Sequence, residues 1–166
     1  MPLNVEALFR EHSDALFRYL VRLTGDVELA ADATQEAFVR MIELQPEDRQ
    51  LRAWLYTVAT NVAREWARTR DRRRALAVAA QARLAPDPLP TPDELAHAHS
   101  QAARIRRALD TLTERDRTIL LMREQGFAHR EIADAVGTTT RSVGTMIARA
   151  LDKLTAALNI DPEPTT

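Results

Sequence analysis

Apolar residues recur at helical spacing through the first 80 residues, and two breaks divide them into three helices. The first helix ends at Gly25, because glycine readily takes the left-handed conformation that closes helices. The second spans about Val27 to Leu44, and the third begins near Leu51, beyond the polar segment around Pro46. The apolar positions are Val5, Leu8, Phe9, Leu16, Leu20 and Leu23 in the first helix and Ala30, Ala33, Ala37, Phe38 and Met41 in the second. The pattern predicts a compact three-helix unit.

The third helix combines an apolar stripe with a cluster of arginines. The stripe consists of Trp54, Leu55, Val58, Val62 and Trp66. This spacing favours Trp54 as a core residue, whereas Tyr56 and Asn61 lie off the stripe and are expected at the surface. The arginines toward the far end of the helix are Arg64, Arg68, Arg70, Arg72, Arg73 and Arg74.

A second set of three helices follows between Leu112 and Leu158, in the order of a helix-turn-helix. Thr113 can cap the first of them, Gly126 stands past its end, and the short second helix stops at Gly137. The apolar positions of the second and third are Ile132, Ala133, Val136, Val143, Ile147, Ala150, Leu151, Leu154 and Leu158. Three ordinary bundle helices are the alternative, but the pattern favours a recognition helix for the major groove of duplex DNA.

A proline-rich segment separates the two sets of helices. Prolines occupy positions 86, 88, 90 and 92, and such segments favour extended conformations. A capping box at 91–94, with proline at the first helical position, begins the next helix. The predicted fold class is therefore all-α, with two small helical domains joined by a Pro-rich linker. The predicted ranges are 1–78 for the first domain, 79–98 for the linker, 99–160 for the second domain and 161–166 for a frayed tail.

Composition narrows the class of protein. The chain has 166 residues and no cysteine, which excludes disulfides and fits a reducing cytoplasm. No apolar run approaches the roughly 20 residues that span a bilayer. The histidines, His12, His97, His99 and His129, lack the spacing of metal ligands, and neither a phosphate loop nor a nucleophile elbow is present. We therefore expect a cytoplasmic protein with no cofactor, no metal, no membrane insertion and no catalytic activity.

The net charge of −1 conceals an uneven distribution. Residues 1–50 carry five basic and ten acidic side chains, whereas residues 51–83 carry eight basic and two acidic ones. A basic block in a near-neutral chain indicates a surface that faces a polyanion, and a solvated arginine face is the alternative.

Two sets of side chains suit contact with nucleic acid. A recognition helix presents its first turn to base edges, while nearby hydroxyls and arginines hold phosphates. The residues predicted to contact duplex DNA are Thr139, Thr140, Arg141, Ser142, Thr145 and Arg149. Among these, Arg141 is the first choice for a guanine contact, because it is the only long donor near the first turn. Aromatics beside arginines suit a single strand, and the residues predicted to contact one are Tyr56, Asn61, Arg64, Arg68, Arg72 and Arg73.

Several segments match the motifs of a known family, in the same order. Segment 32–41, DATQEAFVRM, resembles a D-x-x-Q-E-x-F stretch, and segment 51–61 with its following arginines resembles a part that melts and reads the −10 promoter element. Segments 108–112, 131–137 and 142–150 resemble a domain that reads the −35 element. Together they resemble bacterial RNA polymerase sigma factors of the extracytoplasmic-function (ECF) group, within the sigma-70 family. The resemblance covers nearly the whole chain apart from the linker and the tail.

The resemblance implies a transcription initiation factor rather than an enzyme. Its first domain would be sigma region 2, a helical bundle, and its second would be sigma region 4, a helix-turn-helix. Such a factor binds core RNA polymerase, directs it to specific promoters and helps to open the −10 region. The residues implied to bind the clamp helices of the polymerase β′ subunit are Asp32, Gln35, Glu36 and Arg40. The implied partners are core RNA polymerase, whose β flap would contact the second domain, promoter DNA and an anti-sigma factor.

Two positions depart from the family pattern, and two other functions compete with this one. Thr113 replaces a common proline, which a capping threonine should tolerate, and Gly144 stands where many relatives carry lysine or arginine. Gly144 either permits close approach to the DNA backbone or is a tolerated exposed glycine. The main alternative function is a stand-alone helix-turn-helix regulator that binds duplex operator DNA without polymerase. The other is an adaptor that binds another regulator, and the arginine-rich helix argues against it.

Overall fold

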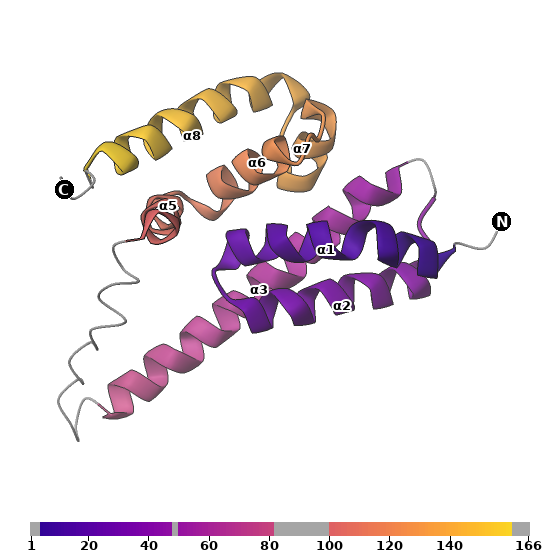
Figure 1. Cartoon of the computed structure of the whole chain (residues 1–166), viewed down its shortest axis with the longest axis horizontal. Coiled ribbons are helices and arrows are strands. Elements are labelled where there is room, and N and C mark those ends of the chain that lie inside the picture. The colour runs from indigo at the N-terminus through magenta and orange to yellow at the C-terminus, as the bar shows by residue number, and fades with distance from the viewer. Residues whose placement is uncertain (1–3, 48–49, 82–99, 161–166) are drawn as a thin grey trace. The chain divides into compact units, whose positions relative to one another are not determined.

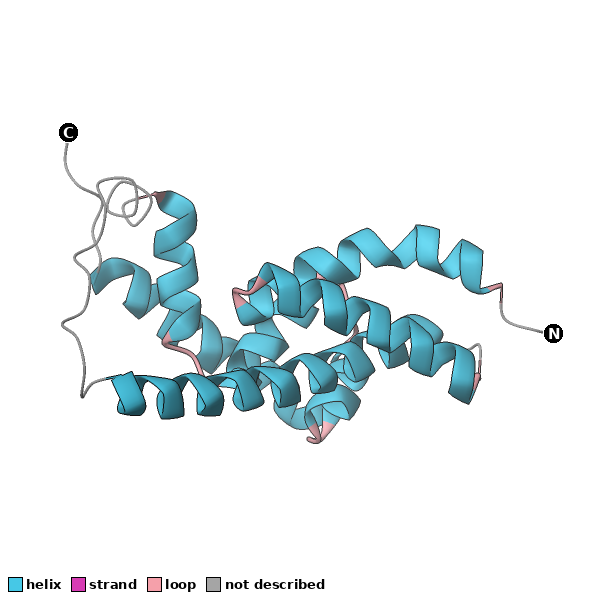
Figure 2. Cartoon of the chain, turned by 90° about the horizontal axis from the view of Figure 1, so that it is seen from below, coloured by secondary structure: helices cyan, strands magenta, loops and turns pink. Residues whose placement is uncertain are grey.

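The computed structural model describes residues 4–47, 50–81 and 100–160 (Figure 1). These residues form seven helices and no strand, which confirms the all-α prediction (Figure 2). The chain divides into two compact units, residues 1–86 and 87–166. The capping box at 91–94, most of the linker and the tail at 161–166 lie outside the described residues.

The first unit consists of α1 (Val5–Thr24), α2 (Val27–Leu44) and α3 (Leu51–Gln81). Local capping sets the first two helices. The Gly25 residue closes α1 with a φ of 72°, and the Asp26 carboxylate accepts a hydrogen bond of 2.9 Å from the Leu29 N–H at the start of α2. The predicted range of α2 is confirmed, whereas α3 continues to Gln81, past the predicted domain boundary at 78.

The core of this unit lies where α2 packs against both other helices. Ala30, Ala33 and Ala37 of α2 are fully buried, and their small side chains allow close approach of the helices. The exposure of Phe9 differs from the prediction: this residue is 45% exposed, and its ring lies 4.9 Å from that of the buried Phe38. The position of Phe9 near the start of α1 leaves it covered on one side only.

A buried polar contact joins α1 to α3. The Tyr19 and Thr60 hydroxyl oxygens are 2.8 Å apart, and Thr60 donates its own hydrogen to the Tyr56 carbonyl at 2.7 Å. Tyr19 is therefore the donor to Thr60. Its ring lies 5.0 Å from the Tyr56 ring, so both tyrosines are part of the core.

The second unit consists of α5 (Gln101–Asp110), α6 (Glu114–Glu124), α7 (His129–Val136) and α8 (Thr140–Ile160). The predicted caps are confirmed: the Thr113 hydroxyl accepts a hydrogen bond of 3.1 Å from the Asp116 N–H, and Gly126 and Gly137 have φ values of 84° and 67°. The largest fully buried side chains of this unit are Ile119, Met122, Phe127 and Ile132. The predicted core residue Leu151 is 48% exposed. Within the described ranges, no helix has the length and apolar character needed to cross a membrane.

Candidate nucleic-acid interfaces and docking face

The first turn of α8 presents a polar outer face. Thr139 lies just before this turn and Ser142 lies within it, and their hydroxyl oxygens are 2.8 Å apart. The Ser142 N–H donates to the Thr139 carbonyl at 3.0 Å. All six residues predicted to contact duplex DNA are exposed or partly exposed: Thr139, Thr140, Arg141, Ser142, Thr145 and Arg149. The opposite side of α8 carries the buried Val143 and Ala150. The structure therefore brings the predicted duplex-contacting residues to one end and one side of the helix.

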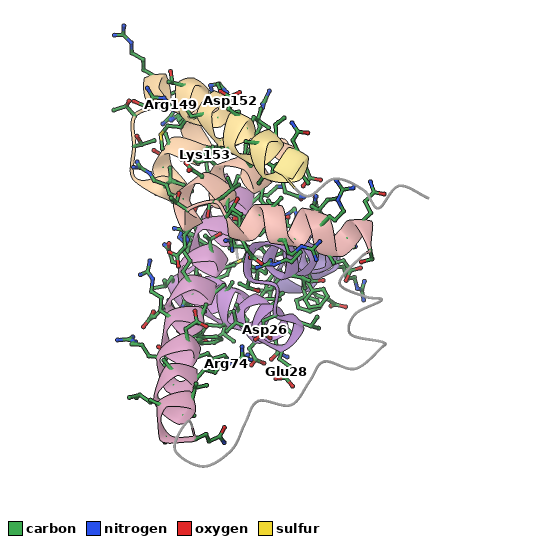
Figure 3. All side chains as sticks on the ribbon, turned by 90° about the vertical axis from the view of Figure 1, so that its left-hand side faces the viewer. Asp26, Glu28, Arg74, Arg149, Asp152 and Lys153 are labelled. Carbon is green, nitrogen blue, oxygen red and sulfur yellow. The ribbon has the colours of Figure 1, made fainter. Side chains whose placement is uncertain are left out.

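Two other residues of α8 lie next to neighbouring helices, and we do not include them in this face. Lys153 donates to the Asp116 carboxylate of α6 at 2.6 Å, so it ties α8 to the helix beneath it (Figure 3). A Cβ atom at Gly144 would lie 3.7 Å from the His129 ring of α7. The side-chain position at 144 is thus next to α7, at an ordinary contact distance.

The outer face of α3 gathers one set of arginines. At about 100° per residue, Asn61, Arg68 and Arg72 fall within a narrow sector of the helix, and all three are exposed. Arg64 lies at the edge of this sector and is half-buried, whereas the exposed Arg73 points to a neighbouring side. We call Asn61, Arg64, Arg68 and Arg72 the outer face of α3.

The structure reverses the predicted roles of two aromatic residues. Tyr56 was expected at the surface, but it is only 1% exposed because α3 packs against both α1 and α2. Trp54 was expected in the core, but it is half-buried and lies in the same sector of α3 as Asn61. The prediction of Tyr56 as an accessible contact for a base is therefore wrong, and Trp54 is the better placed ring.

The inner side of α3 carries a second set of charged residues. The Arg70 guanidinium donates to the Asp26 carboxylate at 2.7 Å and lies 3.9 Å from that of Asp32. The hydrogen bond from the Leu29 N–H and, less strongly, the Arg70 guanidinium lower the pKa of Asp26 against the opposing effect of partial burial. Arg74 lies beside Asp26 and Glu28 on the rim of a surface hollow of about 460 Å³ (Figure 3).

One side of α2 is left uncovered by α1 and α3. Asp32 has a side chain 60% exposed, Gln35 is exposed, and Glu36 pairs with Arg40 at 2.8 Å. Val39 and Ile42, 46% and 49% exposed, lie in the same part of the helix. We call Asp32, Gln35, Val39 and Ile42 the docking face. The sequence signal for the two apolar members was their position off the buried stripe of alanines.

A groove between α5 and α8 was also missed from the sequence. It has a volume of about 470 Å³, and the residues that line it include Ala108, Ala156 and Ala157. Its basic residues are Arg104 and Arg107 of α5 and Lys153 of α8. The groove lies on a different part of the unit from the first turn of α8.

The fold and these faces define a two-unit helical protein with a helix-turn-helix for duplex DNA and a separate arginine-bearing helix. Comparison with known families gives two matches: residues 8–73 match sigma-70 region 2, and residues 102–154 match sigma-70 region 4. These ranges lie within the segments formed by α1 to α3 and by α5 to α8. The chain belongs to the sigma-70 family of RNA polymerase sigma factors, in the ECF group.

Individual relatives agree with this assignment. The chain is 31% identical to the RNA polymerase sigma factor NccH of Alcaligenes xylosoxydans xylosoxydans, over 76% of this chain and 72% of that protein. It is 26% identical to the sigma factor YlaC of Bacillus subtilis, over 89% and 87%. It is 29% identical to the ECF sigma factor SigE of Mycolicibacterium smegmatis over 90% of this chain, and this match covers only 59% of the length of SigE.

Solved structures share the fold. The chain matches CnrH, solved with the cytosolic domain of CnrY, with a TM-score of 0.70 and 22% identity over 95% of this chain and 89% of that one. It matches RpoE of Bartonella quintana, solved with the anti-sigma factor NepR, with a TM-score of 0.65 and 20% identity over 95% and 98%.

Proposed function

We propose that this chain binds core RNA polymerase through the docking face of α2 and directs it to promoters with two DNA-binding helices. The observation that carries the proposal is the division of the first unit into two exposed faces, an acidic and apolar one on α2 and a basic one on α3. A stand-alone regulator needs only the helix-turn-helix and gives no role to the other two faces. With polymerase as its partner, the protein acts in the cytoplasm.

In this proposal the first turn of α8 reads the −35 element. Arg141 is exposed at the start of the helix, where a guanidinium can donate two hydrogen bonds to the major-groove edge of guanine. Thr139, Thr140, Ser142 and Thr145 supply hydroxyls, and Arg149, two turns further along, holds a backbone phosphate.

The outer face of α3 takes the opened −10 strand. Arg68 and Arg72 follow the phosphates of the strand, and the half-buried Trp54 stacks its ring on an unstacked base. Capture of a single strand in this way favours strand separation without ATP, because the bound strand is removed from the pairing equilibrium.

The docking face binds the clamp helices of the polymerase β′ subunit. Asp32 and Gln35 give it polar specificity, while Val39 and Ile42 supply apolar area that is otherwise exposed to water. The groove between α5 and α8 is the apolar surface of the second unit that engages the β flap. Glu36 and Arg40 pair with each other at the edge of the docking face and orient its polar rim.

An anti-sigma factor is proposed as a further partner. Its support is that RpoE, which has the same fold, was solved with one. The test is affinity capture of the tagged chain from cells of its source organism, grown with and without stress. Recovery of a second protein that is released under stress supports the partner. Recovery of polymerase subunits alone under both conditions contradicts it.

The function is tested by run-off transcription with purified core polymerase on a library of genomic fragments. Wild type is compared with Arg141→Ala and with Arg115→Ala, which removes the same charge from an exposed position on α6. Specific transcripts that fade with Arg141→Ala and persist with Arg115→Ala support a sigma factor that reads DNA through α8. Binding of duplex DNA by the chain alone, with no transcripts, moves the assignment to a stand-alone regulator.

The role of α3 is tested at promoters found in that assay. The double variant Arg68→Ala with Arg72→Ala should slow opening of the −10 region, while duplex binding at −35 persists. The fluorescence of 2-aminopurine placed in the −10 region measures its opening. Arg18→Ala, on the exposed side of α1, is the charge-matched control. Equal opening by the double variant and the control would show that the strand runs elsewhere.

A further inference from the structure

The docking face lies on α2 and the outer face lies on α3. Arg70 of α3 forms ion pairs with acidic side chains at the start of α2 and in the docking face. It lies on α3, about 180° around the helix from Asn61, and so faces α2 rather than the proposed DNA strand. One of its nitrogens holds Asp26 at 2.7 Å, and the other lies 3.9 Å from Asp32. The two carboxylates therefore share one guanidinium.

The two carboxylates have different roles on α2. Asp26 is the N-cap, and its other oxygen accepts from the Leu29 N–H at 2.9 Å, so the hold of Arg70 on Asp26 fixes the first turn of α2 against α3. Asp32 belongs to the docking face and remains 60% exposed. Glu36, by contrast, pairs with Arg40 of its own helix.

We propose that Arg70 is a positioning residue that couples the docking face of α2 to α3, by holding the N-cap of α2 and setting the carboxylate of Asp32. This inference rests on the proposed docking of polymerase at Asp32. All three side chains are about a third exposed or more, and ion pairs of that kind add little to the stability of a fold, so loss of Arg70 should leave the protein folded.

The coupling has a measurable signature. Arg70→Ala weakens binding of core polymerase although the residue is not in the docking face, and Asp32→Ala weakens it directly. Because both substitutions disturb the same carboxylate, the double variant binds no more weakly than the worse single one. We expect each single change to raise the Kd by about threefold to tenfold. The Kd of the double variant should rise by much less than the product of the two single increases.

The experiment titrates fluorescently labelled full-length chain with core polymerase. The variants are Arg70→Ala, Asp32→Ala, the double variant and Arg70→Lys, with thermal unfolding by circular dichroism to establish that each is folded. Lysine offers a single point charge, which can hold Asp26 but not both carboxylates, so Arg70→Lys recovers only part of the affinity. The matched control is Arg74→Ala, which removes the same charge from the rim of the same hollow.

The outcomes separate this inference from the proposed function. Additive effects of Arg70→Ala and Asp32→Ala, or equal effects of Arg70→Ala and Arg74→Ala, overturn the coupling and leave the docking face intact. An Arg70→Ala variant with wild-type affinity overturns it as well. If Asp32→Ala does not change the Kd for polymerase, then the docking face itself is wrong and the role of Arg70 falls with it.

Discussion

The hydroxyl of Tyr19 is a buried polar group that is hydrogen-bonded to the side chain of Thr60, on another helix of the same unit. Burial raises the pKa of Tyr19 to about 12. The Thr60 hydroxyl, which can turn to donate to the ionised oxygen, and the charge of Arg64 offset part of this effect. Because the folded pKa is higher than the value of 10.0 expected in the unfolded chain, folding is favoured most below pH 10 and less as pH rises toward 12.

Replacement of this tyrosine tests both statements. Tyr19→Phe should lower the unfolding free energy by about 1 kcal/mol near neutral pH, through the lost hydrogen bond. Between pH 10 and 12 the wild type should lose an additional amount of about 2–3 kcal/mol that the variant does not lose. Urea unfolding at several pH values measures both, and an equally steep alkaline loss in Tyr19→Phe would exclude this origin.

Gly144 lies within α8 at a position where the structure leaves room for a side chain. Its side-chain position faces the His129 ring at 3.7 Å, so an alanine methyl fits without displacement. Gly144→Ala should therefore raise the unfolding free energy by about 0.5–1 kcal/mol, because glycine is costly inside a helix. Duplex affinity should be unchanged.

Gly137 provides the comparison for this prediction. Its φ of 67° is in the left-handed region, where an alanine is strained. Gly137→Ala should lower the unfolding free energy by about 1 kcal/mol, and thermal unfolding followed by circular dichroism measures both glycine variants. A loss of stability in both variants would mean that position 144 has less room than its contact with His129 indicates.

At the scale of elements, α2 depends on an ionised N-cap. Asp26→Ala should cost about 1 kcal/mol at neutral pH. Since the pKa of Asp26 is lowered in the folded chain, this contribution is present above its unfolded value of 3.8 and is lost as the pH falls through the folded value. Chemical unfolding of both forms between pH 7 and pH 2 should show their difference shrinking with acid.

The cap of α6 is the control for that experiment. Thr113 caps its helix with a hydroxyl, which has no charge to lose in this range. The cost of Thr113→Ala should be the same at each pH at which the wild type is folded. A parallel acid dependence for both caps would show that Asp26 is not the source of the effect.

At the scale of the whole molecule, the net charge of −1 limits the affinity of the free chain for DNA. Duplex binding without polymerase should be weak and should depend on few phosphate contacts. Arg149→Ala should reduce the slope of log affinity against log salt by about 1 in the holoenzyme and weaken all sequences alike. Arg141→Ala should instead relax the preference for one base. Filter binding measures both effects: a changed base preference in Arg149→Ala and a changed salt slope in Arg141→Ala would show that the two arginines have the opposite roles.

The sequence determined the elements and the family because the signals for both are local. Helix ranges follow from caps such as Gly25, Thr113 and Gly137, whose hydrogen bonds involve residues three or four positions away. The ordered motifs, likewise, are read along the chain without knowledge of its packing. The two units and their region 2 and region 4 identities were therefore accessible before any coordinates.

Only the tertiary structure decided which side of each helix is covered. Periodicity assigned Trp54 to the core and Tyr56 to the surface, but α3 packs against two helices, so its buried sector is wide and includes Tyr56. The roles of the charged residues were also decided by packing. The arginines of α3 are close together in the sequence, but those of the outer face are directed away from α2, whereas Arg70 faces α2 and pairs with its carboxylates. Burial and ion pairing depend on neighbours distant in the chain, which a local pattern does not specify.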